Sequence, residues 1–252
     1  SCFGNPVMKT PNMDKLAKEG VILTNCFIQH TVCSPSRCSM MTGWYPHVMG
    51  HRTLDNLLKP YEPNLFKYLK QSGYHVEWYG KNDLLAKKSF KDSINKVKNT
   101  WDGYCYMPNP WKKNHYLHKS FYFGKRTTDF KGKFMDHDRF WINKAISFVK
   151  NYKGKKPFCL FITLYFPHPP YEVEEPYFSM YKRDKVPLPI PPAFKDKSHF
   201  MKKMHYYYRM NKLKEKDLRE IVATYYGMVT RLDDQLGEIL SEVKNKGIEN
   251  NT

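Results

Sequence analysis

The sequence lacks any long run of apolar residues. The longest run, Phe158 to Phe166, has nine residues, well short of the ~20 that a membrane-spanning helix needs. We therefore expect no membrane span. The six cysteines form no Cys-x-x-Cys pair, and their spacing fits neither a zinc ribbon nor a small disulfide framework. The sequence thus indicates neither a redox compartment nor a localisation.

Acidic residues are scarce relative to basic ones. The 252 residues include 42 Lys and Arg against 24 Asp and Glu, a formal net charge of +18. The excess is concentrated between Lys81 and Lys156, where 19 basic residues face 6 acidic ones. Such a balance favours an anionic partner, such as an acidic polysaccharide, a nucleic acid or a membrane surface. A solvated lysine-rich face is an equally good explanation.

Helical and strand-like patterns alternate along the chain, which is long enough for one large domain. This alternation predicts an α/β fold with a largely parallel sheet. A long amphipathic helix is expected at the end, because apolar residues recur there with a helical period. The predicted helices are Pro11 to Gly20, Pro63 to Gln71, Asp136 to Tyr152 and Lys214 to Lys246, and the predicted strands are Val21 to Ile28, Tyr74 to Tyr79 and Phe158 to Tyr165.

Three polar residues follow the predicted strands. Cys33, Lys81 and His168 each lie shortly after one of them, and ligands of such sheets gather beyond the carboxyl ends of the strands. Two irregular stretches, Trp101 to Arg126 and Tyr171 to Phe194, are expected to shape a pocket rim.

The segment Cys33-Ser-Pro-Ser-Arg37 carries the most chemical information. Pro35 and the small serines suit the start of a helix running toward Thr42-Gly43, whose free N–H groups and positive dipole end favour an anion. A cysteine at a helix N-terminus with an arginine nearby is the usual setting for a reactive thiol. The planar fork of arginine also matches the oxygens of sulfate or phosphate.

This segment, followed by Thr42-Gly43, resembles the signature of the formylglycine-dependent (type I) sulfatases of the alkaline phosphatase superfamily. The resemblance covers nearly the whole chain and implies a large, mostly parallel central sheet with helices on both faces. Other segments similar to family segments, in the family's order, are Lys9 to Gly20, Thr42 to His47, Gly80-Lys81, Pro167 to Tyr171 and Tyr225 to Asp233.

The resemblance implies hydrolysis of sulfate esters, with a sulfated small molecule or a sulfated glycan as substrate. A maturation enzyme would oxidise Cys33 to formylglycine, whose hydrate attacks sulfur with one hydroxyl and releases sulfate with the other. A divalent cation, calcium in most members, would bind the modified Cys33. The resemblance implies no nucleic-acid partner.

Four further residues receive roles from the resemblance. Arg37 would contact the modified residue, and Lys81 would hold a sulfate oxygen. His168 matches the histidine that faces the ester oxygen, where it protonates the leaving alkoxide or binds the substrate. Asp83 stands where many members have a histidine, and we keep it as a candidate base; a loop cap is the alternative.

Weaker candidates surround this set. His51, with His47 and Arg52, is a candidate for the substrate side of the site, although a surface loop carries such residues for solubility alone. Several aromatic residues are candidates for stacking on sugar rings or nucleobases, although aromatic residues are more often core. These are Trp101, Tyr104, Tyr106 and Trp111.

The family's remaining metal ligands have no counterpart in this sequence. The resemblance places them on a strand before Ser1 and in segments after Thr252, and Asp233-Asp234 is interpreted as solvated or structural because it lies within a helix. We therefore expect residues 1–252 to be one sulfatase catalytic domain, incomplete at both ends and inactive alone.

Three alternatives stay open. Some phosphonate and phosphodiester hydrolases of the same superfamily share the formylglycine motif. A non-catalytic binder of sulfated glycans or nucleic acid would use the basic stretch and the aromatic residues. Simple thiol chemistry at Cys33, with His168 as base, is the third.

Overall fold

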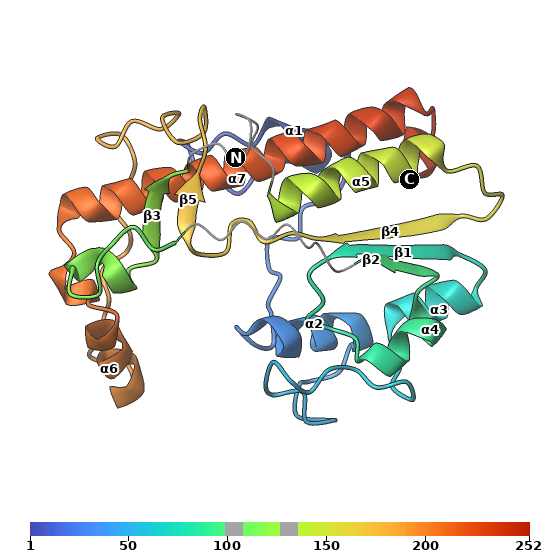
Figure 1. Ribbon diagram of the computed structural model, residues 1–252, viewed down its shortest axis with the longest axis horizontal. Coiled ribbons are helices and arrows are strands. Elements are labelled where there is room, and N and C mark those ends of the chain that lie inside the picture. Colours follow the sequence, from blue (N-terminus) through green and yellow to red (C-terminus); the bar gives the residue numbers. More distant parts are fainter. Residues whose placement is uncertain (99–107, 127–135) are drawn as a thin grey trace. The chain divides into compact units, whose positions relative to one another are not determined.

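The structure is a computed structural model that describes residues 1–98, 108–126 and 136–252 (Figure 1). The chain divides into two compact units, and each consists of segments that are distant in sequence. Unit one comprises Ser1–Val21, Tyr104–Asp136 and Phe166–Glu238, and unit two comprises Ile22–Gly103, His137–Tyr165 and Ile239–Thr252.

Unit two contains a three-stranded parallel sheet in the order β2-β1-β4. The central strand β1 (His75–Gly80) pairs with β4 (Phe158–Thr163), so that Gly80 lies opposite Thr163 at their carboxyl ends. The parallel sheet and the two longer strands confirm the sequence prediction. The short edge strand β2 (Lys96–Lys98) and the helix α4 (Phe90–Ser93) were not expected.

Helices cover both faces of this sheet (Figure 1). Val76 and Trp78 of β1 are fully buried on the face toward α3 (Leu65–Gln71), where they pack in one cluster with Phe66. Tyr79 points to the opposite face and packs against Trp141 of α5 (His137–Asn151). This alternation follows from the two-residue period of a strand. Burial of each large side chain contributes about 1.5–3 kcal/mol.

Unit one is organised along the helix α7 (Glu215–Asn245), whose last turns belong to unit two. Its bounds agree with the predicted helix to one residue at each end. Asp217 accepts a hydrogen bond from the Lys214 N–H, which satisfies a donor that the helix start leaves unpaired. After the helix ends, Gly247 adopts a left-handed φ of 72°, as is common after a helix.

The other elements of unit one are short. The helices are α1 (Pro11–Glu19) and α6 (His199–Tyr207). The strands β3 (Tyr122–Lys125) and β5 (Tyr171–Val173) form a parallel pair. They lie in the two stretches that the sequence indicated as irregular, and this pairing joins those stretches.

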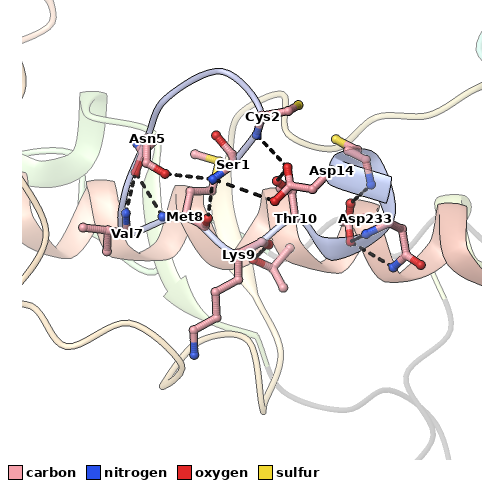
Figure 2. Close-up of polar contacts among 12 residues, drawn as sticks. Ser1, Cys2, Asn5, Val7, Met8, Lys9, Thr10, Asp14 and Asp233 are labelled. Carbon is pink, nitrogen blue, oxygen red and sulfur yellow. Dashed lines mark hydrogen bonds and ion pairs between the residues drawn. The ribbon is translucent and has the colours of Figure 1, made fainter. Parts of the chain in front are cut away.

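The carboxylate of Asp233 caps the start of α1 (Figure 2). Asn12 donates to it from its backbone N–H and its side chain, at 3.0 and 2.9 Å, and the Met13 N–H donates at 2.8 Å. Pro11 has no N–H, so these bonds account for the first donors of the helix. Thr10, the residue before Pro11, makes no side-chain cap bond to the helix and donates its hydroxyl to Asp14. Asp233 is thus structural.

The predicted strand Val21 to Ile28 is wrong. This segment contains no strand in the part of the chain that the structure describes, and Val21 and Phe27 are 86% and 82% exposed. β-Branched and aromatic residues favour a strand because they fit a half-buried pleated surface. No described neighbour supplies that surface here, and the composition alone does not form a strand.

Candidate active site

Cys33 is the first residue of the helix α2 (Cys33–Thr42), as the sequence predicts. Val32 precedes it in an extended conformation, and no side chain among the described residues caps this helix start. Pro35 in the first turn costs no hydrogen bond, since that position has no intrahelical partner. The helix ends at Gly43, which adopts a φ of 75°. The thiol of Cys33 is half-buried at the dipole's positive end.

Arg37 joins this helix to the end of β1. It lies one helical turn after Cys33 and therefore on the same face of α2. Its Nη1 donates to the backbone carbonyl of Lys81 at 3.3 Å. The same carbonyl accepts from the Thr163 hydroxyl at 2.8 Å. The helix that carries Cys33 and the residue that follows β1 are thus tied together inside unit two.

Gly80 permits the close approach of two strand ends. Its φ is 103°, and a Cβ atom there would lie 2.1 Å from the Thr163 carbonyl oxygen. That oxygen accepts a hydrogen bond from the Lys81 N–H at 3.2 Å. Only glycine fits this position without a backbone shift. The Gly80-Lys81 pair therefore has a geometric reason: the glycine allows the contact that fixes the lysine backbone.

The ammonium group of Lys81 stands among polar and aromatic neighbours. Its Nζ lies 3.0 Å from Asp83 Oδ2 and 5.4 Å from the centre of the Tyr165 ring. The Lys81 side chain is 27% exposed, which leaves it accessible to an anion. Asn82, rather than Asp83, caps the loop, because its side chain accepts from the N–H groups of Leu84 and Leu85.

Burial separates the cysteines chemically. Burial, reinforced by the negative charge of Glu62, raises the pKa of the Cys38 thiol to about 11, and burial also raises the pKa of Cys159. Thiols that stay neutral in this way are poor nucleophiles. Cys33 stands at a helix start, so it is the best placed of these three thiols.

The three histidine candidates and Arg52 differ in their exposure and in their contacts. His168 belongs to unit one, where it is exposed and its Nδ1 lies 2.6 Å from the carbonyl oxygen of Pro169. His47 and Arg52 are exposed in unit two. His51 is buried: its Nδ1 lies 2.6 Å from the Asn56 carbonyl oxygen and its Nε2 lies 2.8 Å from Glu62. Both ring nitrogens of His51 are therefore engaged internally.

The remaining candidates are held by internal contacts or fall outside the described residues. Trp111 donates its indole N–H to the Tyr122 carbonyl and stacks on His115. Asp234, beside the cap at Asp233, accepts from the Tyr177 hydroxyl. Trp101, Tyr104 and Tyr106 lie outside the residues that the structure describes.

Two contributors to this site were not predicted from the sequence. Thr163 and Tyr165 lie at and after the end of β4, on the strand next to β1. The signal that points to them is the rule that parallel strands end at the same edge of a sheet.

Among residues 1–98, 108–126 and 136–252, no group of three or more His, Cys, Asp or Glu could hold a metal ion. None of the described helices is long and apolar enough to cross a bilayer.

Comparison with known sequences gives one family. The Sulfatase family model matches residues 1–252. The multifunctional alkaline phosphatase superfamily protein PehA of Trinickia caryophylli is 27% identical, and the match covers 96% of this chain and 55% of that protein. The arylsulfatase of Clostridium perfringens is 25% identical, over 99% of this chain and 57% of that enzyme. The chain spans about half the length of these relatives.

Solved structures with the same fold are alkaline-phosphatase-like. The phosphonate monoester hydrolase of Agrobacterium radiobacter superposes with a TM-score of 0.73 at 19% identity, over 99% of this chain and 57% of that chain. A protein solved in complex with its substrate D-glucosamine-2-N,6-O-disulfate gives 0.72 at 19% identity, over 100% and 60%. These likenesses show that the chain has part of an alkaline-phosphatase-like α/β fold.

Proposed function

Because this chain belongs to the sulfatase family of the alkaline phosphatase superfamily, we propose that the protein hydrolyses sulfate esters with a nucleophile made from Cys33. We further propose that residues 1–252 are one part of a longer sulfatase domain. The chain covers only about half of its relatives.

One contact carries the proposal. The Arg37 guanidinium donates to the Lys81 carbonyl. The helix start with Cys33 and the lysine after β1 are therefore joined within one compact unit. A formylglycine at Cys33 would supply, as its hydrate, the hydroxyl that attacks sulfur. The helix N-terminus and the Lys81 ammonium would then both favour the negative charge that develops on the sulfate oxygens.

Asp83 and His168 are proposed for the proton transfers. The Asp83 carboxylate is ion-paired with Lys81, which keeps a proton acceptor next to the group that would bind sulfate. His168 is exposed, and an imidazole is a group that can protonate a leaving alkoxide.

A divalent cation is part of the proposal, with calcium as the expected ion. Calcium takes six to eight oxygen ligands. The described residues do not fit such a site by themselves, since they hold no group of three candidate ligands. We therefore assign only the modified Cys33 to the metal, and its other ligands would come from outside the residues that the structure describes.

The mass of the tryptic peptide from Glu19 to Arg37, isolated from active full-length protein, tests the nucleophile. We expect formylglycine at Cys33 and an intact thiol at Cys26, which lies in the same peptide. Cys33→Ala should abolish turnover of an aryl sulfate. Lys81→Ala should lower kcat/KM by about 10²–10³-fold, as expected for loss of a group that stabilises an oxyanion, and His168→Ala should lower it strongly.

Cys26→Ala is the matched control, because Cys26 is exposed and has no role in the proposal. It should retain full turnover. An unmodified Cys33 thiol in active protein would overturn the formylglycine proposal. Faster cleavage of an aryl phosphodiester than of an aryl sulfate by the full-length protein would overturn the substrate class and favour a phosphodiester or phosphonate hydrolase.

A further inference from the structure

Two segments of unit one form a basic surface with exposed aromatic side chains. One segment is residues 108–126, and the other is α6 with the short 3₁₀ helix η4 (Met210–Lys212) that follows it. We call this the basic–aromatic surface and represent it by Lys112, Lys113, Lys119, Lys203, Tyr207 and Lys212.

Direct contacts hold the two segments together. Arg209 Nη1 donates to the carbonyls of Lys113 and His115, at 3.3 and 2.7 Å. The Lys119 ammonium lies 3.5 Å from the centre of the Tyr207 ring, a cation–π distance. The basic groups of both segments therefore belong to one surface, although about 90 residues separate them in the sequence.

The positive charges of this surface are not neutralised by acidic residues of the same two segments. No Asp or Glu occurs in residues 108–126, and none occurs between Lys197 and Lys214. In the described part of the chain, Lys125 and Arg126 have acidic partners, whereas none of the five lysines that represent the surface forms an ion pair. Clustered like charges of this kind raise the local concentration of polyanions.

The arrangement of aromatic and basic groups suits a sugar chain with sulfate groups. Tyr207 is 59% exposed and lies one helical turn after Lys203, so the two share a face of α6. An exposed tyrosine ring offers an apolar face with a polar tip, which fits the C–H face of a sugar ring. An ammonium beside the ring is a compact partner for a sulfate.

We propose that the basic–aromatic surface is a binding site for a sulfated polysaccharide chain. The choice of a sulfated glycan rests on the proposed function, since a sulfatase gains from a surface that retains the polymer whose esters it cleaves. A nucleic acid would meet the same lysines, and the test separates the two polymers.

Binding to heparin is the test, measured on the full-length protein with Cys33→Ala so that no ester is cleaved. Replacement of Lys112, Lys113, Lys119 and Lys203 by Gln should weaken heparin binding by about tenfold or more, and the affinity should depend less steeply on salt. The matched control replaces Lys150, Lys153, Lys155 and Lys156 by Gln. It removes the same charge from exposed positions in unit two, and it should change the affinity by less than about twofold.

Three results would overturn the site. They are equal losses in the two variants, no loss in the first, or tighter binding of a short single-stranded DNA than of heparin at the same salt concentration. Turnover of a small aryl sulfate by the first variant, with Cys33 intact, is expected to stay unchanged. Failure of the proposed function would abolish this turnover and leave heparin binding in place, so the two proposals fail separately.

Discussion

Glu172 of β5 is buried next to the guanidinium of Arg126, whose Nε lies 3.4 Å from its carboxylate. Burial raises the pKa of Glu172 to about 7, Arg126 opposes the rise, and the carboxylates of Asp136 and Glu174 add to it. The ordinary value is 4.5, so the folded protein binds a proton here more tightly than the unfolded chain. The contribution of this proton binding to the free energy of unfolding is fully present below pH 4.5 and is lost as the pH rises through 7.

Substitution of Glu172 by Gln should remove this dependence. Between about pH 4.5 and 7, the free energy of unfolding of the wild type is expected to fall, relative to the variant, by up to about 3 kcal/mol. Urea unfolding of both proteins across this range measures the difference. Parallel pH profiles would contradict the prediction.

Single residues were predicted from the sequence only where a motif fixed them. Cys33 and Arg37 stand at the expected helix start, because local chemistry decides where a helix begins. His51 shows the limit: its partner Glu62 lies eleven residues away, and only the fold of the loop brings their side chains together. Thr163 escaped notice for the same reason, since its contact with Lys81 arises from strand pairing.

Among the elements, α1 depends on a side chain from α7. Asp233 accepts the first backbone donors of α1, and Asp233→Ala would leave them unpaired. We expect a loss of about 1–2 kcal/mol in the free energy of unfolding. Hydrogen exchange at the Asn12 and Met13 amides should accelerate more than exchange within α7, which separates a local effect on α1 from general destabilisation.

Asp233→Asn is the matched control for this cap. The amide keeps one oxygen acceptor and the same size, so the loss should be smaller than in Asp233→Ala. Equal stability and equal exchange in wild type and Asp233→Ala would show that the cap contributes nothing.

Long elements with a clear period were predictable, and short paired ones were not. The periodic apolar residues of α7 placed both of its ends within one residue. The strands β3 and β5 have four and three residues, too few for a pattern to emerge, and they form because they pair. The segment from Val21 to Ile28 has the composition of a strand but pairs with none of the described strands.

At the scale of the whole molecule, the chain is about half as long as the relatives it matches. We therefore predict that residues 1–252, produced alone with calcium present, show no turnover of an aryl sulfate, whereas the full-length protein does. Hydrolysis of the aryl sulfate is measured for both proteins, at equal concentrations and with equal modification of Cys33. Similar turnover by the two would contradict the proposal that this chain is one part of the catalytic domain.

The cap at Asp233 also sets an order of events during synthesis. The acceptor that completes α1 is translated 221 residues after Asn12. At a typical rate of about 5–20 residues per second, the ribosome takes roughly 10–40 s to add it. Through that interval α1 emerges without its partner, and the cap forms only after Asp233 has been added.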